Sequence, residues 1–120
     1  MKEEYKVLYS PAAKDDLRGI YRYIAVDLVE PGFARKQIDR IREKIRNLGA
    51  FPKKHQAVDW EPWASMGMRR IPVDNYVVFY LVNDSHNQVM IVRIFYGGRD
   101  IENIISDITN DKGDSLNGIK

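Results

Sequence analysis

The residues best suited to chemistry on a phosphate group lie in the second half of the chain: Arg69, Arg93, Arg99 and Tyr96. Cleavage of RNA without a metal needs a base for the 2′-hydroxyl proton, an acid for the leaving oxygen and cations for the phosphorane charge. The arginines are candidates for stabilising that charge, and Tyr96 is a candidate for proton transfer. His55 is a second candidate for proton transfer, together with Lys53 or Lys54 if either is buried. These residue types permit metal-independent RNA cleavage if the fold brings them into one site.

A basic segment in the middle of the chain could bind an anionic target. Between Pro31 and Arg70 there are ten Lys and Arg residues but only four Asp and Glu residues, whereas the whole chain has a net charge of +2. The segment therefore carries a charge of +6, and the rest of the chain carries −4. The candidates for binding a nucleic acid or another target are Lys53, Lys54, His55 and Arg70. The alternative is a solvated loop beside a solvated helix face.

Some of these residues also have structural interpretations. Arg93 falls in the middle of a predicted strand and could form an ion pair with Asp74 or Asp100. Asp100 could instead be the N-cap of a following helix. Trp60 and Trp63 are interpreted as packing residues, with stacking on nucleic-acid bases as the alternative.

Length and composition restrict the class of protein. A chain of 120 residues is expected to form one domain, long enough to bury a core without disulfides or a metal. There is no cysteine and the two histidines lie 31 positions apart, so we expect no metal site and no cofactor. No apolar segment is long enough to cross a bilayer, and the start has no apolar signal segment. We therefore expect a soluble, cytoplasmic protein without membrane contact.

Three strands are predicted in the second half of the chain. Residues 76–82 form an uninterrupted β-prone apolar run, which is typical of a strand covered on both faces. Turn formers at 83–87 separate this run from another at 89–96, and residues 68–73 precede the pair as a further strand. We expect the arginines to gather at one end of this sheet, where they could hold phosphate or a carboxylate-rich partner.

The first half of the chain predicts a short strand at 6–9 and two helices. Ser10 and Pro11 are typical of a helix start, with Ser10 as the N-cap, and apolar residues at helical spacing continue to about Val26. A second apolar stripe predicts a helix at 31–48 with Gly49 as its C-cap. The short break between them predicts an antiparallel hairpin whose apolar stripes face the sheet. Four tyrosines are expected in the core and at its rim: Tyr5, Tyr9, Tyr21 and Tyr23.

The remaining segments complete the predicted domain. Residues 51–67 have no clear period and are interpreted as a loop, with at most a poor edge strand. Residues 100–108 predict a terminal helical turn or two, and residues 109–120 have the composition of a disordered tail. We predict one α+β domain over residues 1–108, in which an N-terminal strand and a helical hairpin pack on a three- to four-stranded antiparallel sheet.

Three stretches of the chain carry a further signal. They are YKVLYSPAA at 5–13, MRRIPVDNYVVFY at 68–80 and VRIFYGGRD at 92–100. In their order and spacing these stretches resemble the RelE/ParE superfamily, the toxins of bacterial type II toxin–antitoxin systems, over roughly residues 4–108. The resemblance implies the same α+β fold and a protein that inhibits bacterial growth until a cognate antitoxin neutralises it.

Within that superfamily the chain looks closer to the ParE branch, which inhibits DNA gyrase. The RelE branch cuts mRNA on the ribosome and carries an arginine where this chain reads about Val77, and it places a catalytic tyrosine or histidine near its C-terminus. Neither group is present here, although Arg99 matches a RelE-type arginine and Tyr96 could replace the ring. The ParE branch lacks the same groups and ends its last strand in glycine–arginine–aspartate, as this chain does. An RelE-like endoribonuclease and an inactive relic that only binds antitoxin remain the alternatives.

The resemblance also implies a surface for the antitoxin. Antitoxin tails commonly wrap around their toxins in this superfamily, so we expect an apolar groove beside the helices or along an open sheet edge. Arg42 and Arg46 lie off the apolar stripe of the second helix and should form the basic rim of that groove.

Overall fold

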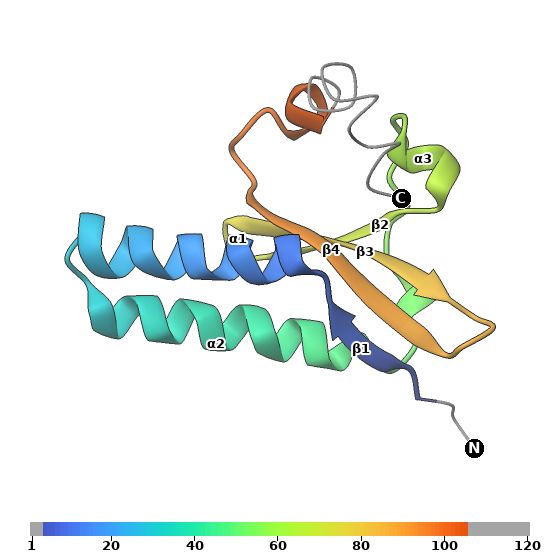
Figure 1. The fold of residues 1–120 in the computed structure, drawn as a ribbon, viewed down its shortest axis with the longest axis horizontal. Helices are drawn as coiled ribbons and strands as arrows, with labels where there is room; N and C mark the ends of the chain where they lie inside the picture. The colour runs from blue at the N-terminus through green and yellow to red at the C-terminus, as the bar shows by residue number, and fades with distance from the viewer. Residues whose placement is uncertain (1–3, 106–120) are drawn as a thin grey trace.

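The computed structural model describes residues 4–105 of the chain. An α-helical hairpin lies across one face of a four-stranded sheet, and the short helix Trp63–Met66 lies on the other face (Figure 1). The helices and strands, in chain order, are β1 (Lys6–Tyr9), α1 (Pro11–Arg22), η1 (Tyr23–Asp27), α2 (Pro31–Asn47), η2 (Pro52–Lys54), α3 (Trp63–Met66), β2 (Arg69–Val73), β3 (Tyr76–Asn83) and β4 (Gln88–Tyr96). Residues 101–105 are also helical. The predicted α+β class is confirmed. The terminal helix beyond residue 105 and the predicted tail at 109–120 lie outside the described residues.

The sheet has the strand order β1-β4-β3-β2. Strands β2, β3 and β4 form the predicted antiparallel meander. The fourth strand differs from the prediction, because β1 pairs parallel with β4, from Lys6 beside Gln88 to Tyr9 beside Ile91. No short turn joins these two strands, since most of the chain lies between them. Their relative direction is therefore set by where the helical hairpin returns the chain, which local sequence does not reveal.

The helical hairpin packs on the sheet through the predicted apolar stripes. Ser10 caps α1 as expected, because its hydroxyl accepts a hydrogen bond of 3.0 Å from the Ala13 backbone N–H. Ile41 and Ile45 on α2 are almost fully buried, and Ile38 is half-buried. Burial of such side chains is the main stabilising contribution, at about 25 cal/mol per Å² of apolar area. The core between hairpin and sheet comprises Ala13, Leu17, Ile41, Ile45, Leu48, Ile71, Val73, Val78, Tyr80, Val89, Ile91 and Ile94.

The connection between the two long helices is irregular. The first helix ends in a turn of π-helix, η1, and the loop that follows places Val29 in the left-handed region with a φ of 55°. Val29 is 74% exposed. A β-branched residue in this region is strained, and its exposure means that no packing compensates for the strain.

A second apolar cluster covers the other face of the sheet. Trp63 is buried there and stacks on Trp60 at a ring distance of 5.2 Å, while Phe79 contacts both indoles. The tryptophans are therefore packing residues, as interpreted from the sequence. The segment predicted as a loop contains η2 and α3, and Ala57 bridges the outer edge of β2 at Arg69.

The end of α2 differs from the prediction in one respect. Leu48, not Gly49, occupies the C-cap position. Gly49 is needed for a different reason, since a Cβ atom there would lie 3.0 Å from the Tyr5 carbonyl oxygen. The Tyr5 N–H donates a hydrogen bond of 2.8 Å to the Gly49 carbonyl. The absence of a side chain at Gly49 therefore lets the backbone before β1 contact the backbone after α2.

Candidate functional site

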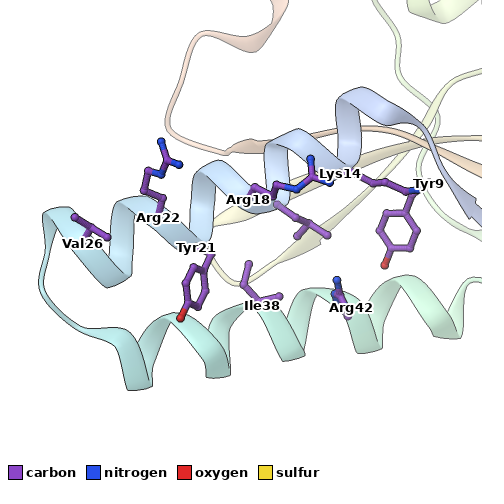
Figure 2. Close-up of a pocket in the computed structure, with 9 residues that line it drawn as sticks. Tyr9, Lys14, Arg18, Tyr21, Arg22, Val26, Ile38 and Arg42 are labelled. Carbon is purple, nitrogen blue, oxygen red and sulfur yellow. The ribbon is translucent and has the colours of Figure 1, made fainter.

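A groove runs along the helical hairpin between α1 and α2, with a volume of about 690 Å³ (Figure 2). Leu17, Val26 and Ile38 are its apolar lining residues. The rings of Tyr9 and Tyr21 lie in the space between the two helices (Figure 2). Tyr21 is 39% exposed and lines this groove, and Tyr23 is 53% exposed. The prediction that these two tyrosines belong to the core and its rim was therefore wrong for Tyr23.

Basic side chains border the groove on both helices. Arg42 lines it from α2, and Arg46 lines an adjoining hollow with Val7, Tyr9 and Ile45. These two arginines were predicted from the sequence. The residues that the sequence analysis missed are those of the opposite border on α1, namely Lys14, Arg18 and Arg22. Their four-residue spacing, which places them in one row on a helix, was the available signal.

Tyr9 joins the groove to the edge of the sheet. Burial raises the pKa of its hydroxyl, and the positive charges of Arg42 and Arg46 partly oppose that shift. The adjoining hollow reaches Val7 on β1, which is the edge strand of the sheet. In the part of the chain that the structure describes, no strand pairs with the outer side of β1. An apolar groove, a basic border and an open strand edge are therefore continuous.

A second cleft, of about 760 Å³, lies between the tip of the hairpin and the ends of β3 and β4. Tyr96 and Arg99 both line it, so the structure brings together two of the four residues predicted for catalysis. Exposed apolar side chains on the helical side complete the lining, among them Tyr23, Leu28 and Phe33.

Arg93 lies beside this second cleft but is held in an ion pair. Its Nε and Nη2 atoms donate hydrogen bonds of 2.8 and 3.0 Å to the two carboxylate oxygens of Asp16 on α1. Asp16 also accepts a hydrogen bond of 2.8 Å from the Ile94 backbone N–H. The carboxylate therefore takes the place of a neighbouring strand where β4 extends beyond β1.

The predicted partners of Arg93 were wrong, because each has another contact. Asp74 accepts hydrogen bonds from Arg40 and Gln37, which hold the pKa of its carboxyl below the usual value. Asp100 accepts a hydrogen bond from the Asn103 side chain, and its carbonyl accepts one from the Ile104 N–H. The second of these bonds places Asp100 at the start of the terminal helical turn, as expected.

Arg69 begins β2 and lies beside the middle of β3, where it pairs with Tyr80. Tyr96 pairs with Tyr76, which is four residues from Tyr80, or about 13 Å along β3. The Arg69 Nη1 atom donates a hydrogen bond of 2.7 Å to the His55 carbonyl. The arginines therefore do not gather at one end of the sheet, and that prediction was wrong.

His55 lies with Arg69 rather than with Tyr96. Its ring meets the edge of the buried Tyr80 ring at 6.5 Å. Burial lowers the pKa of His55, and the charges of Lys54, Lys44 and Arg69 lower it further.

The other residues predicted to bind a target are placed differently. Lys53 is paired with Asp84 at 3.1 Å. Arg70 alternates with Arg69 along β2, so its side chain lies on the opposite face of the sheet.

The fold is of the RelE/ParE type, an α+β domain with a helical hairpin across a four-stranded sheet. Residues 7–101 match the family model described as the ParE toxin of the type II toxin–antitoxin system parDE. Since the match spans most of the chain, the chain belongs to the ParE toxin family. No curated protein matches the sequence. None of the helices in residues 4–105 is long and apolar enough to span a membrane.

Solved structures share the fold at low sequence identity. The chromosomal ParDE toxin–antitoxin system from P. aeruginosa matches with 22% identity and a TM-score of 0.64, covering 78% of this chain and 96% of that one. The RelBE2 toxin–antitoxin complex from Mycobacterium tuberculosis matches with 18% identity and a TM-score of 0.56, covering 78% and 92%. The archaeal RelE–RelB complex from Pyrococcus horikoshii OT3 matches with 20% identity and a TM-score of 0.54, covering 80% and 98%.

Proposed function

We propose that this ParE-family toxin arrests bacterial growth by binding DNA gyrase, without cutting RNA, and that a cognate antitoxin neutralises it by occupying the groove between α1 and α2. The proposal that the toxin does not cut RNA rests on one observation: the candidate RNA-cleaving residues lie in two separate places. The strand positions of Arg69 and Tyr96 are about 13 Å apart along β3. His55 lies with Arg69, and Arg99 lines the second cleft with Tyr96. A general base and the cations of one transition state must act within hydrogen-bond distance of the same phosphate.

The state of Arg93 adds to this argument. Both oxygens of Asp16 occupy its guanidinium, so its charge is already neutralised by a fixed partner. An arginine that stabilises a phosphorane must direct its N–H groups at the substrate. A toxin that acts by binding a protein target needs no such constellation.

The proposal for the antitoxin rests on the shape and charge of the groove. An amphipathic segment could insert apolar side chains over Leu17 and Ile38, while acidic side chains meet the cations on both borders. The three related structures are described as a toxin–antitoxin system or as toxin–antitoxin complexes. An acidic partner segment would complement a border that is basic on both helices.

Induction of the toxin in bacteria tests the target. We expect growth arrest, DNA-damage signalling and loss of supercoiling, with transcripts intact when their ends are mapped. Discrete cuts within the codons of translated messages would contradict the gyrase proposal. Harmless expression would instead identify an inactive relic whose remaining role is antitoxin binding.

A RelE-like endoribonuclease is the second candidate, because Tyr96 and Arg99 do share one cleft. Under that alternative, Arg99→Ala should abolish cleavage with little change in stability, since the exposed guanidinium contributes mainly to transition-state charge. Transcript mapping with this variant separates the two functions.

The antitoxin proposal is tested by charge reversal on the groove. Arg42→Glu with Arg46→Glu should weaken antitoxin binding about tenfold or more and reduce its dependence on salt. Arg35→Glu with Lys36→Glu is the matched control, because these exposed residues of the same helix line neither the groove nor the adjoining hollow. If both pairs weaken antitoxin binding equally, or if the affinity does not change over a salt series, the antitoxin does not bind through the basic border of the groove.

A further inference from the structure

The helical hairpin is longer than the sheet that it covers. Figure 1 shows its connecting end extending beyond the ends of β3 and β4. The second cleft lies under this end of the hairpin, where it meets the ends of the two strands. Tyr23, Leu28 and Phe33 line the cleft from the helical side and are 53%, 50% and 51% exposed. Apolar side chains of the hairpin therefore continue past the sheet that buries the rest of them.

The connection between the helices adds to this apolar surface. Every residue from Val26 to Phe33 is exposed, and we call residues 26–33 the hairpin tip. Val29 is 74% exposed and has a φ of 55°, which asparagine or glycine adopts with less strain. Strained residues are concentrated at functional sites. A valine that is both strained and uncovered in the monomer therefore indicates a surface that a partner covers.

The apolar surface is large enough for a stable protein interface. Tyr23, Leu28, Val29 and Phe33 of the hairpin and Tyr96 of β4 are between 50% and 74% exposed. At such fractions each side chain presents roughly 100 Å², so that together they present roughly 500 Å². A symmetric pair of chains would bury roughly 1,000 Å², which is about the lower limit for a specific interface before any polar rim is counted.

Charge complementarity points to a second copy of this chain as the occupant of the second cleft. In the hairpin tip two acids, Asp27 and Glu30, flank the apolar Leu28 and Val29. The cleft offers the matching surface, because its lining is largely apolar and Arg99 adds an exposed cation. Within residues 4–105, no ion pair includes either tip acid or this arginine. A tip placed in the cleft of another copy would supply both kinds of contact.

The acids around the cleft have other partners. Asp15 and Asp16 line it, but they are paired with Arg18 and Arg93. Asp100 follows the cleft arginine in the chain and accepts a hydrogen bond from a side chain of its own helical turn. The positive charge of the arginine is therefore available to an acid from outside.

The wall of the cleft on β4 is fixed before a partner arrives. The Tyr96 ring meets the Tyr76 ring at 5.9 Å and an angle of 72°. On its other side, a Cβ atom at Gly98 would lie 2.6 Å from the Tyr96 ring, so the ring can lie against this turn only because the residue is glycine. A fixed wall reduces the conformational entropy that is lost on binding.

We propose that two copies of this chain associate about a twofold axis, with the hairpin tip of each copy in the second cleft of the other. Leu28 and Phe33 belong both to the tip and to the lining of the cleft. The two contacts therefore adjoin, and one axis relates them. Leu28 and Val29 of one copy cover Tyr23 and Tyr96 of the other, while the tip acids face the cleft arginine. This pairing concerns the free protein and does not depend on which target the toxin inhibits.

Sedimentation velocity of the purified full-length chain tests the pairing. As the concentration increases from about 1 to about 200 µM, the mass should increase from 14.0 kDa towards twice that value. Arg99→Glu should weaken the dimer about tenfold or more, and so should Asp27→Lys with Glu30→Lys, because each places like charges opposite one another. A mixture of the two variants should dimerise again, because each hairpin tip then meets a cleft of opposite charge.

Val29→Asn separates the interface from the strain in the monomer. Below the dissociation constant of the dimer, this change should stabilise the folded chain, because asparagine tolerates the φ of 55°. At higher concentration it should weaken the dimer about fivefold, because an apolar contact is lost. Opposite effects on folding and on association are not expected of a residue whose role is confined to the fold.

Matched controls reverse the same charges elsewhere. Asp39→Lys with Asp59→Lys, and separately Lys54→Glu, alter exposed residues outside the tip and the cleft. They should change dimerisation less than about twofold. Circular dichroism of each variant keeps loss of folding separate from loss of association.

Several results would overturn the proposal. A chain that stays monomeric at the highest concentration has no such dimer, and equal weakening by the controls would show an effect of net charge alone. A mixture of the two charge variants that stays monomeric would exclude the contact between tip and cleft. If the chain is monomeric but the tip variants weaken binding to the antitoxin or to gyrase, that protein covers the tip instead.

Discussion

Replacing Asp16 by alanine should lower the free energy of unfolding by about 3 kcal/mol. Asp16 joins α1 to the free edge of β4, since it accepts hydrogen bonds from the Nε and Nη2 atoms of Arg93 and from the Ile94 N–H. The two side chains of this ion pair are only 14% and 28% exposed. Water therefore replaces the lost partner poorly.

The magnitude follows from these contacts. A hydrogen bond to a charged group contributes about 1.5–3 kcal/mol, and a buried N–H without an acceptor costs about 1–3 kcal/mol. The contributions do not add fully, because the Arg93 guanidinium also lies over the Phe95 ring, 4.5 Å from its centroid, and keeps that favourable contact when Asp16 is removed. About 3 kcal/mol corresponds to a decrease in Tm of about 10 °C for a domain of this size.

Urea denaturation of Asp16→Ala beside Asp15→Ala measures the effect. Asp15 is the adjacent residue of the same type, but it is 75% exposed and its ion pair is with the equally exposed Arg18. Its removal should change stability by less than about 0.5 kcal/mol. Adding Arg93→Met to Asp16→Ala should restore part of the loss, because no buried charge then lacks a partner. A difference between the two alanine variants below about 0.5 kcal/mol would refute the assigned role of Asp16.

Two further predictions concern Val29 and Tyr80. Val29→Asn should raise the free energy of unfolding by about 1 kcal/mol and Tm by a few degrees. Asparagine tolerates the φ of 55°, and the valine side chain, which is 74% exposed, contributes little packing. An unchanged or lower Tm would show that the backbone at Val29 is not strained. Tyr80→Phe should lower the free energy of unfolding by about 1–2 kcal/mol, because the hydroxyl donates a hydrogen bond of 2.6 Å to the Pro52 carbonyl. Burial also raises the pKa of Tyr80 from 10.0 to about 12. The unfolded chain therefore loses this proton first, and stability should fall as the pH rises from 10 to 12. Urea denaturation of the wild-type protein and of Tyr80→Phe across this pH range should show a smaller fall in the variant. Identical pH profiles would contradict the assignment of this fall to the Tyr80 hydroxyl.

The elements of this protein are determined by local sequence. The turn formers at 83–87 and the flanking apolar runs specify the β3–β4 hairpin, and Ser10 with Pro11 specifies where α1 begins. These signals act between residues close together in the chain, so they are visible without the fold. The same is true of the basic border of the groove, since Arg42 and Arg46 lie off an apolar stripe that must face inward.

Tertiary structure decided which chemical groups meet. The sequence placed Arg93 in a strand, but its partner is Asp16, far away in the chain, because β1 ends at Tyr9 and leaves the adjoining edge of β4 to α1. Likewise, strand register puts Arg69 beside His55 and away from Tyr96. Register and the direction of β1 depend on the packing of the whole hairpin against the sheet, which no short stretch of sequence contains.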